Sequence, residues 1–357
     1  MPTVLPLSPR LTVVRRPHKA LVLSLPLVPA SFFGMVLGLL GLGGAWRAAH
    51  RVWVMPAWIG EFLMVSGTLV FAVLIVLFGA KWLVAREAAL REANDPVQCC
   101  FLGLVGVTTS LVAVAAFPYS RPTATYLFAA GTSFTLWFAL WRTGRLWQGG
   151  RDPGATTPVP YLPAVAGTFV TAIAASALGY SDWGRLAFGA GVFSWLAIES
   201  VLLHRLYTGP VLPAALRPTL GIQLAPPMVG AVAYLSVTVG PPGLVAYALL
   251  GYGLLQALLL LRLLPWIGRQ SFSPSYWSFS FGATALATAP LRTIERGDNG
   301  PPAVIAVPCF VAANLVLAAL AVGTLNLAAR RRLLSGGAPD AVPTTPPLSG
   351  ETMESIL

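Results

Sequence analysis

Serine and threonine hydroxyls recur in apolar segments of this sequence that lack Asp, Glu, Lys, Arg and His. A hydroxyl donates a weak hydrogen bond that can replace part of the water shell of an anion and still release it. The same groups could instead hydrogen-bond neighbouring helices to one another, so both roles stay open. The candidate hydroxyls belong to Thr108, Thr109, Ser110, Thr168, Thr171, Ser176, Ser278, Ser280, Thr284 and Thr288.

One acidic residue, Glu199, lies inside an apolar segment. A carboxylate within a membrane indicates a functional site by default, for example a proton relay. Glu199 could also have a structural role and pair with Arg205 or Arg262. The sequence favours this structural pairing over proton coupling, because the segment that carries Glu199 is expected to be an outer helix.

The residue patterns of common enzymes are missing from the sequence. It contains no Ser-His-Asp arrangement, no paired carboxylates and no HExxH motif. Cys99, Cys100 and Cys309 lie in apolar segments and form no CxxC pair, so we expect small buried side chains rather than a disulfide framework or a zinc site. The sequence therefore predicts no cofactor, no metal site and no enzymatic activity.

The composition requires a membrane. The chain has 357 residues, of which 56% are hydrophobic and 10% charged, and its mean hydropathy is +0.74. Soluble domains carry about a quarter charged residues, so lipid must cover part of this surface. A helical span needs about 20 mainly apolar residues, and the long Leu- and Ala-rich runs do not alternate as barrel strands do. The sequence predicts an all-α membrane protein with transmembrane helices at 23–46, 59–82, 98–117, 123–142, 160–179, 184–204, 218–239, 242–264, 275–292 and 302–328.

Basic residues are unevenly distributed between the connecting loops. The formal net charge is +11, but Lys and Arg lie between apolar runs rather than on one face, which argues against nucleic-acid binding. Most fall on the side of the N-terminus, so the positive-inside rule places both termini of this multi-pass cell-membrane protein in the cytoplasm. We expect a basic cytoplasmic tail at 1–22, a transmembrane domain at 23–329 and a disordered cytoplasmic tail at 330–357.

Odd- and even-numbered spans differ in composition. Between their assumed ends, the odd spans contain no Asp, Glu, Lys, Arg or His and are rich in Gly, Ala, Ser and Thr, whereas several even spans are rich in Leu and Trp. Small residues let helix backbones approach closely, and bulky aliphatic residues suit a surface that faces lipid. This pattern predicts five helical hairpins with odd helices inside and even helices outside. Each odd span also carries one large residue in a similar place, namely Phe33, Phe101, Phe169, Met228 and Phe281.

Several segments resemble one known family. "GIQLAPPMVGAVAYLS", "GYGLLQALLLLRLLPWI" and "WSFSFGATALA", together with "LWQGG" and "YLPAVAGTFVTA", are similar to the TehA-like tellurite-resistance/dicarboxylate transporter family, which includes the slow-type anion channels of plant guard cells. The resemblance covers roughly residues 26–329. It implies ten helices in five hairpins around a quasi-fivefold central pore, usually assembled as a homotrimer.

The resemblance also assigns roles to residues. The gate of the family falls on Phe281, and Phe33, Phe101 and Phe169 match other positions around the same constriction, while Met228 departs from the aromatic pattern. Kinks of the inner helices are expected at Pro163 and Pro226, since proline removes a backbone hydrogen bond. The hydroxyls expected to line the pore are those of Thr108, Thr168, Ser280 and Thr284.

Two transport functions and a third class remain open. The resemblance implies a gated channel or transporter that passes small inorganic or organic anions through a phenylalanine-occluded pore. The alternative is a proton-coupled carrier for malate-like dicarboxylates, or a sulfite exporter. A carrier should need a titratable group on the pore axis, and the odd spans offer none, which favours the channel. A membrane-embedded enzyme or scaffold would require polar side chains that converge from several spans.

Overall fold

The computed structural model describes residues 26–149 and 156–334, and within these ranges it is helical and contains no strand. The predicted tail at 1–22 and all but the first few residues of the tail at 330–357 lie outside the described residues. Each even-numbered span is one long α-helix. These helices are α2 (Ala57–Val84), α5 (Arg121–Trp147), α7 (Ser181–Thr208), α9 (Leu244–Ile267) and α11 (Pro301–Ala329).

Each odd-numbered span has two parts, a short 3-10 or π helix followed by an α-helix. These pairs are η1 (Ala30–Phe32) with α1 (Phe33–Trp53), η2 (Gln98–Gly103) with α4 (Leu104–Ala116), η4 (Leu162–Ala166) with α6 (Gly167–Ala177), η5 (Ala214–Leu224) with α8 (Ala225–Val237) and η6 (Pro274–Phe279) with α10 (Ser280–Ile294). We call these five pairs the inner segments. A further short helix, α3 (Arg86–Asn94), follows α2; its mostly charged sequence gave no apolar signal.

Within the described ranges, seven helices are long and apolar enough to cross a membrane, which makes the chain a multi-pass membrane protein. The seven comprise η1–α1, α2, η2–α4, α7, η5–α8, α9 and α11. The apolar helix at Leu162–Ala177 is shorter, and α5 and α10 are not among the seven. Basic residues such as Arg121 and Arg145 lower the hydropathy of α5, and α10 contains several threonines and Arg292.

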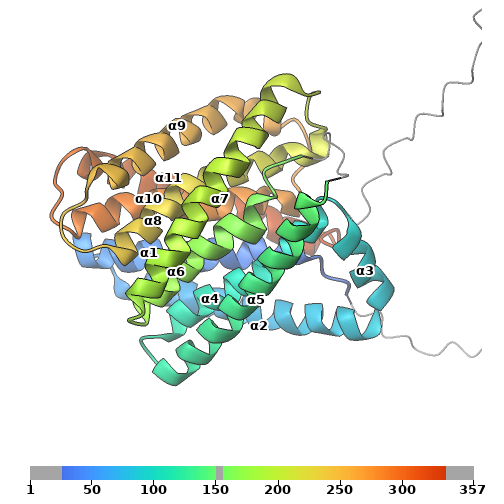
Figure 1. Ribbon diagram of the computed structural model, residues 1–357, viewed down its shortest axis with the longest axis horizontal. Coiled ribbons are helices and arrows are strands. Elements are labelled where there is room, and N and C mark those ends of the chain that lie inside the picture. The colour runs from blue at the N-terminus through green and yellow to red at the C-terminus, as the bar shows by residue number, and fades with distance from the viewer. Residues whose placement is uncertain (1–25, 150–155, 335–357) are drawn as a thin grey trace, which may run out of the picture.

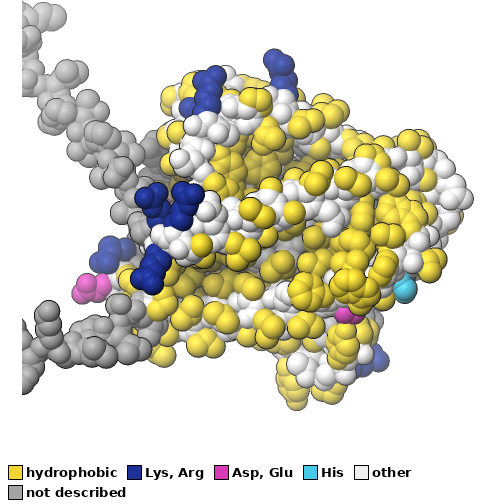
Figure 2. All heavy atoms as spheres, turned by 180° about the vertical axis from the view of Figure 1, so that it is seen from behind, with side chains coloured by type: hydrophobic (Ala, Val, Ile, Leu, Met, Phe, Trp, Pro, Cys, Tyr) yellow, Lys and Arg dark blue, Asp and Glu magenta, His cyan; other side chains and the backbone are white. Residues whose placement is uncertain are grey.

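Burial divides the helices into an inner and an outer set, as their composition predicted. In the most apolar stretch of each helix, at least 72% of the residues are buried for the helices that include α1, α4 and α8. The corresponding share is at most 33% for α2, α7, α9 and α11. The exposed large hydrophobic residues within the long helices all belong to the outer set. Figure 2 shows such side chains over most of one face, with Lys and Arg gathered toward one end. This outer surface is suited to lipid contact.

The helix contacts form hairpins and a closed ring. Each inner helix packs against the outer helix that follows it, so α1 contacts α2, α4 contacts α5, α6 contacts α7, α8 contacts α9 and α10 contacts α11. Among the inner helices, α1 contacts α4, α4 contacts α6, α6 contacts α8, α8 contacts α10, and α10 returns to α1. The inner helices consequently lie between the outer helices in Figure 1.

A buried ion pair fastens the beginning of the first inner segment. Lys81 near the end of α2 lies 2.5 Å from the Glu92 carboxylate of α3, and their side chains are only 6% and 8% exposed. The Lys81 ammonium also donates to the Val28 carbonyl (3.2 Å), and the Ala30 amide donates to Glu92 (2.7 Å). The pair therefore joins α2 and α3 to the chain that leads into η1.

Candidate functional site

The inner segments enclose a cavity of about 40 Å³, which offers space for a few water molecules. All of its lining residues come from the five inner segments and from Tyr161, which directly precedes η4. Each segment contributes, through Gly34 and Leu37, Phe101 and Leu104, Val165 and Phe169, Ile222 and Val229, and Trp277 and Phe281. The lining is mostly apolar and contains no Asp, Glu, Lys, Arg or His.

The cavity lies where the 3-10 or π part of each inner segment gives way to the α-helix. Proline explains part of this irregularity, because it lacks the amide hydrogen needed by a regular helix. Pro163 lies within the π-helical η4, and Pro226 lies in the first turn of α8, directly after η5. These are the two positions at which kinks were predicted. Helix η2 is irregular without any proline.

Three of the five large residues predicted for the inner spans meet at the cavity. Phe281, the second residue of α10, is 8% exposed and lines it together with Phe101 and Phe169. The other two residues face outer helices instead. The fully buried Phe33 ring packs edge-on against the Phe71 and Phe78 rings of α2, with centroid distances of 6.3 and 5.8 Å.

Met228 fills the interface between α8 and α9. Its side chain is fully buried, and a Cβ atom added at Gly253 of α9 would lie 2.3 Å from its sulfur. Glycine at position 253 therefore makes room for the Met228 side chain. Like Phe33, Met228 is not among the residues that line the cavity.

The four hydroxyls expected to line a pore all donate to backbone carbonyls. Thr108 donates to Leu104 (2.7 Å), Thr168 to Ala164 (2.7 Å) and Thr284 to Phe281 (3.0 Å), each within its own segment. None of these threonines lines the cavity.

Ser280 links two inner helices. Its hydroxyl donates to Trp277 (2.7 Å) and reaches across to the Gly34 carbonyl of α1 (3.1 Å), and the residue does not line the cavity. This contact between helices corresponds to the structural role that the sequence left open.

Other serines bring hydroxyl groups to the cavity. Ser31, Ser275 and Ser278 line it, and only Ser278 belonged to the candidate set. The Ser278 hydroxyl donates to the Pro218 carbonyl. The hydroxyls of Ser31 and Ser275 make no hydrogen bond within the part of the chain that the structure describes. Ser31 lies within η1 and Ser275 within η6, and the sequence pattern did not single out these positions.

Glu199 is buried, and its partners differ from those that the sequence suggested. Within the described ranges no ion pair joins it to Arg205 or Arg262. Its carboxylate accepts hydrogen bonds from three neutral donors, the Tyr161 hydroxyl, the Tyr252 hydroxyl (2.5 Å) and the Trp195 indole (3.0 Å). The expected arginine pairing is therefore wrong, and Tyr161 connects this carboxylate to the cavity.

Replacing Glu199 by Gln tests how much these three hydrogen bonds contribute to stability. The Glu199 carboxylate accepts all three, whereas a glutamine side chain has one acceptor oxygen and an NH2 group that must itself donate. We expect Glu199→Gln to lower the free energy of unfolding by about 1.5–3 kcal/mol, the range for hydrogen bonds to charged groups. Denaturant unfolding in detergent micelles measures this change.

Tyr252→Phe serves as the matched control, because it removes one donor and leaves the carboxylate in place. This substitution should lower the free energy of unfolding by less than Glu199→Gln does. A Glu199→Gln variant as stable as the parent protein would show instead that these hydrogen bonds do not require the carboxylate.

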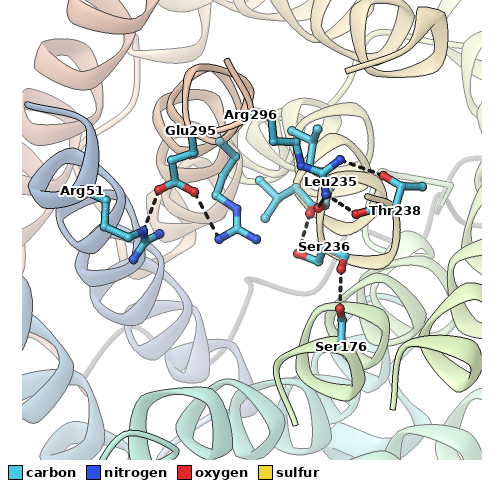
Figure 3. A network of polar contacts seen from close by, with 9 residues as sticks. Arg51, Ser176, Leu235, Ser236, Thr238, Glu295 and Arg296 are labelled. Carbon is cyan, nitrogen blue, oxygen red and sulfur yellow. Dashed lines mark hydrogen bonds and ion pairs between the residues drawn. The ribbon is translucent and has the colours of Figure 1, made fainter. Parts of the chain in front are cut away.

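Arginines meet the C-terminal ends of the inner helices. Arg296, just after α10, donates to the Leu235 and Thr238 carbonyls at the end of α8, while Ser176 of α6 donates to Ser236 (Figure 3). Arg296 thereby satisfies carbonyl groups that the helix leaves without partners and balances the negative end of its dipole. Burial lowers the pKa of Arg296, yet a guanidinium remains charged at neutral pH.

The fold and the site define a class, a multi-pass helical membrane protein whose inner segments surround a cavity lined without charged residues. Comparison with known proteins is in agreement. The chain matches the voltage-dependent anion channel family (SLAC1) over residues 28–325 and belongs to that family. The family transports anions across membranes and is not a family of enzymes.

The similar proteins come from bacteria and plants. The chain is 36% identical over 263 residues to the tellurite resistance protein TehA homolog of Haemophilus influenzae, which covers 73% of this chain and 80% of that protein. It is 25% identical to the guard cell S-type anion channel SLAC1 of Arabidopsis thaliana and 24% identical to the S-type anion channel SLAH3 of the same plant. Each plant match covers 83% of this chain but only 55% and 48%, respectively, of the plant channels.

Proposed function

We propose that this protein is a gated channel for small anions, closed at the cavity by Phe281. The observation that carries the proposal is that residues from all five inner segments line one cavity and that the Phe281 ring is among them. Because the lining holds no carboxylate, a cation would find no negatively charged ligand there. A narrow apolar constriction blocks ions by excluding water, and a side-chain rotation can open it.

Ten spans and a central pore follow from the same proposal. We take α5, η4–α6 and η6–α10 as additional membrane spans, because each forms a hairpin or ring contact with helices of sufficient length. The pore then runs along the axis of the five inner segments, in the quasi-fivefold arrangement that the sequence resemblance implies. The excess of basic residues on the side of the N-terminus supports cytoplasmic termini. A homotrimer remains part of the proposal on the basis of the resemblance alone.

Current recordings from purified protein in planar bilayers test the function. We expect anion currents with chloride, nitrate, sulfite or malate that are linear in voltage and independent of a pH gradient. The currents should be larger in a variant without the Phe281 ring. Purified, folded protein that passes no current with any of these anions, with or without that ring, would contradict the channel.

One observation favours a proton-coupled carrier as the second candidate. The cavity-lining Tyr161 donates a hydrogen bond to the buried Glu199, so a titratable group lies one side chain away from the proposed pathway. A carrier should take up malate into liposomes when a pH gradient is imposed and carry little current. The two functions are separated by measuring uptake and current on the same preparation.

A further inference from the structure

Arg292 lies on the same face of α10 as Phe281. It follows Phe281 by about three helical turns, or about 16 Å, and Thr288 lies between them about two turns along. Thr288 and Arg292 are half-buried, and all the remaining residues from 282 to 293 are buried. Because Phe281 faces the cavity, this partly accessible line of residues leads from the cavity to the C-terminal end of the inner helices.

The guanidinium of Arg292 is poorly neutralised. Its closest carboxylate oxygen is on Glu295 at 3.5 Å, and within the described residues it donates no hydrogen bond. Glu295 is shared, because Arg51 approaches its other oxygen at 2.8 Å (Figure 3). Arg51 and Arg292 thus share one carboxylate, while the Arg296 guanidinium is directed at the backbone carbonyls of Leu235 and Thr238.

Several other charged residues at this end of the bundle are already engaged. Arg47 forms a bidentate pair with Glu61 at 2.8 Å, and Arg185 pairs with Asp182 at 2.8 Å. Asp298 accepts from the Tyr247 hydroxyl at 2.6 Å. Arg292 and Arg51 differ from these residues because they share the single carboxylate of Glu295.

The C-terminal ends of the inner helices make a positive charge at Arg292 favourable for an anion. The C-terminal ends of the inner helices carry partial negative charge, which would repel an anion. Contacts such as Ser176 to Ser236 and Arg296 to Leu235 show that the ends of α6, α8 and α10 lie together. A guanidinium among them can offset this repulsion. Arginine is also more weakly hydrated than lysine and offers paired donors to a planar anion.

We propose that Arg292 binds a small anion, such as chloride or nitrate, at the C-terminal end of the inner helices and raises its concentration at that end of the conduction pathway. This inference rests on the proposed channel function. Phe281 and Arg292 then have separate tasks on α10, the first as the gate and the second as the binding group for anions.

The test compares single-channel currents of the parent protein, Arg292→Gln and Arg292→Lys, all in the Phe281→Ala background that keeps the pathway open. At about 10 mM chloride we expect Arg292→Gln to reduce the current about fivefold, the effect of one unit charge at close range in water. At about 1 M chloride the reduction should be under twofold, because the Debye length is only about 3 Å. Arg292→Lys should keep most of the current.

Arg121→Gln is the matched control. It removes one positive charge from the same end of the bundle, but Arg121 is exposed and lies over the Phe117 ring, 5.8 Å from its centroid. Its current should match the parent current at both salt concentrations. Equal losses in Arg121→Gln and Arg292→Gln would overturn the specific site in favour of a diffuse surface charge.

Chemical modification keeps the test decisive if Arg292→Gln folds poorly. In Arg292→Cys, a cationic methanethiosulfonate reagent should restore the low-salt current, and an anionic reagent should reduce it further. The native Cys99, Cys100 and Cys309 are buried, and the unsubstituted protein controls for their reaction. Identical currents after both reagents would overturn the inference.

Two further outcomes have separate meanings. A lipid phosphate could occupy the same guanidinium, so the recordings are repeated in bilayers of phosphatidylcholine alone; an effect seen only with anionic lipids would overturn a site for free anions. If the Phe281→Ala background passes no anion current at all, the channel function itself fails. If it conducts and the Arg292 variants do not differ from it, only the present inference fails.

Discussion

Phe281→Ala should raise the anion conductance of the protein in a planar bilayer by at least about tenfold, which corresponds to lowering the barrier by about 1.4 kcal/mol. The ring lines the cavity together with Phe101 and Leu37, which come from two other inner segments. Replacing it by a methyl group should enlarge this apolar cavity and admit water, so that an anion can pass without losing its whole hydration shell.

Phe279→Ala is the matched control, because it removes the same side chain two positions earlier. The Phe279 ring stacks on Tyr276, 6.5 Å between centroids, and packs against Gly221; it does not line the cavity. Removing the Phe279 ring should leave the conduction pathway closed at Phe281. If Phe281→Ala is correctly folded and conducts no better than Phe279→Ala, Phe281 is not the gate.

The pattern of ionisable residues predicted the layout of the helices well. A helix without charged residues can be buried on all sides, and a Leu-rich helix can face lipid, so composition alone separated the inner from the outer set. The family resemblance was likewise confirmed by comparison. Helix α3 was missed because it is short and charged and lies outside the apolar runs.

The direction of individual side chains could not be predicted. Each inner segment begins with 3-10 or π turns, whose angular step per residue differs from that of an α-helix. Such turns shift the helical phase by an amount that the sequence does not reveal, particularly in η2, which has no proline. This explains why Phe33 and Met228 face outer helices although they occupy positions similar to Phe281.

The hydrogen-bond and ion-pair partners of buried charged residues could not be predicted either when these partners are distant in sequence. Glu199 of α7 is bound by Tyr161, which precedes η4, and by Tyr252 of α9, whereas the sequence pointed to arginines at nearby membrane ends. The sequence indicated no special role for Lys81 among the basic residues on the cytoplasmic side, yet in the structure its side chain is only 5% exposed. In both cases a buried charge needed a partner, and only the packing of the hairpins decides which one is close enough.

Lys81→Met should lower the free energy of unfolding by about 3–5 kcal/mol, because it leaves the Glu92 carboxylate buried without its cation. The same substitution removes the donor to the Val28 carbonyl, which loosens the chain before η1. Denaturant unfolding in detergent micelles, followed by tryptophan fluorescence, measures the loss.

The double variant Lys81→Met with Glu92→Gln shows whether the loss comes from an unpaired charge. Glutamine is neutral and its carbonyl oxygen can still accept from the Ala30 amide, so the second substitution should restore much of the stability. Arg91→Ala is a control in the same helix, since the Arg91–Glu87 pair is 74% and 94% exposed and should contribute little. Equal stability of the single and double variants would mean that the charge of Glu92 is solvated after Lys81 is removed, and that α3 is not held by this ion pair.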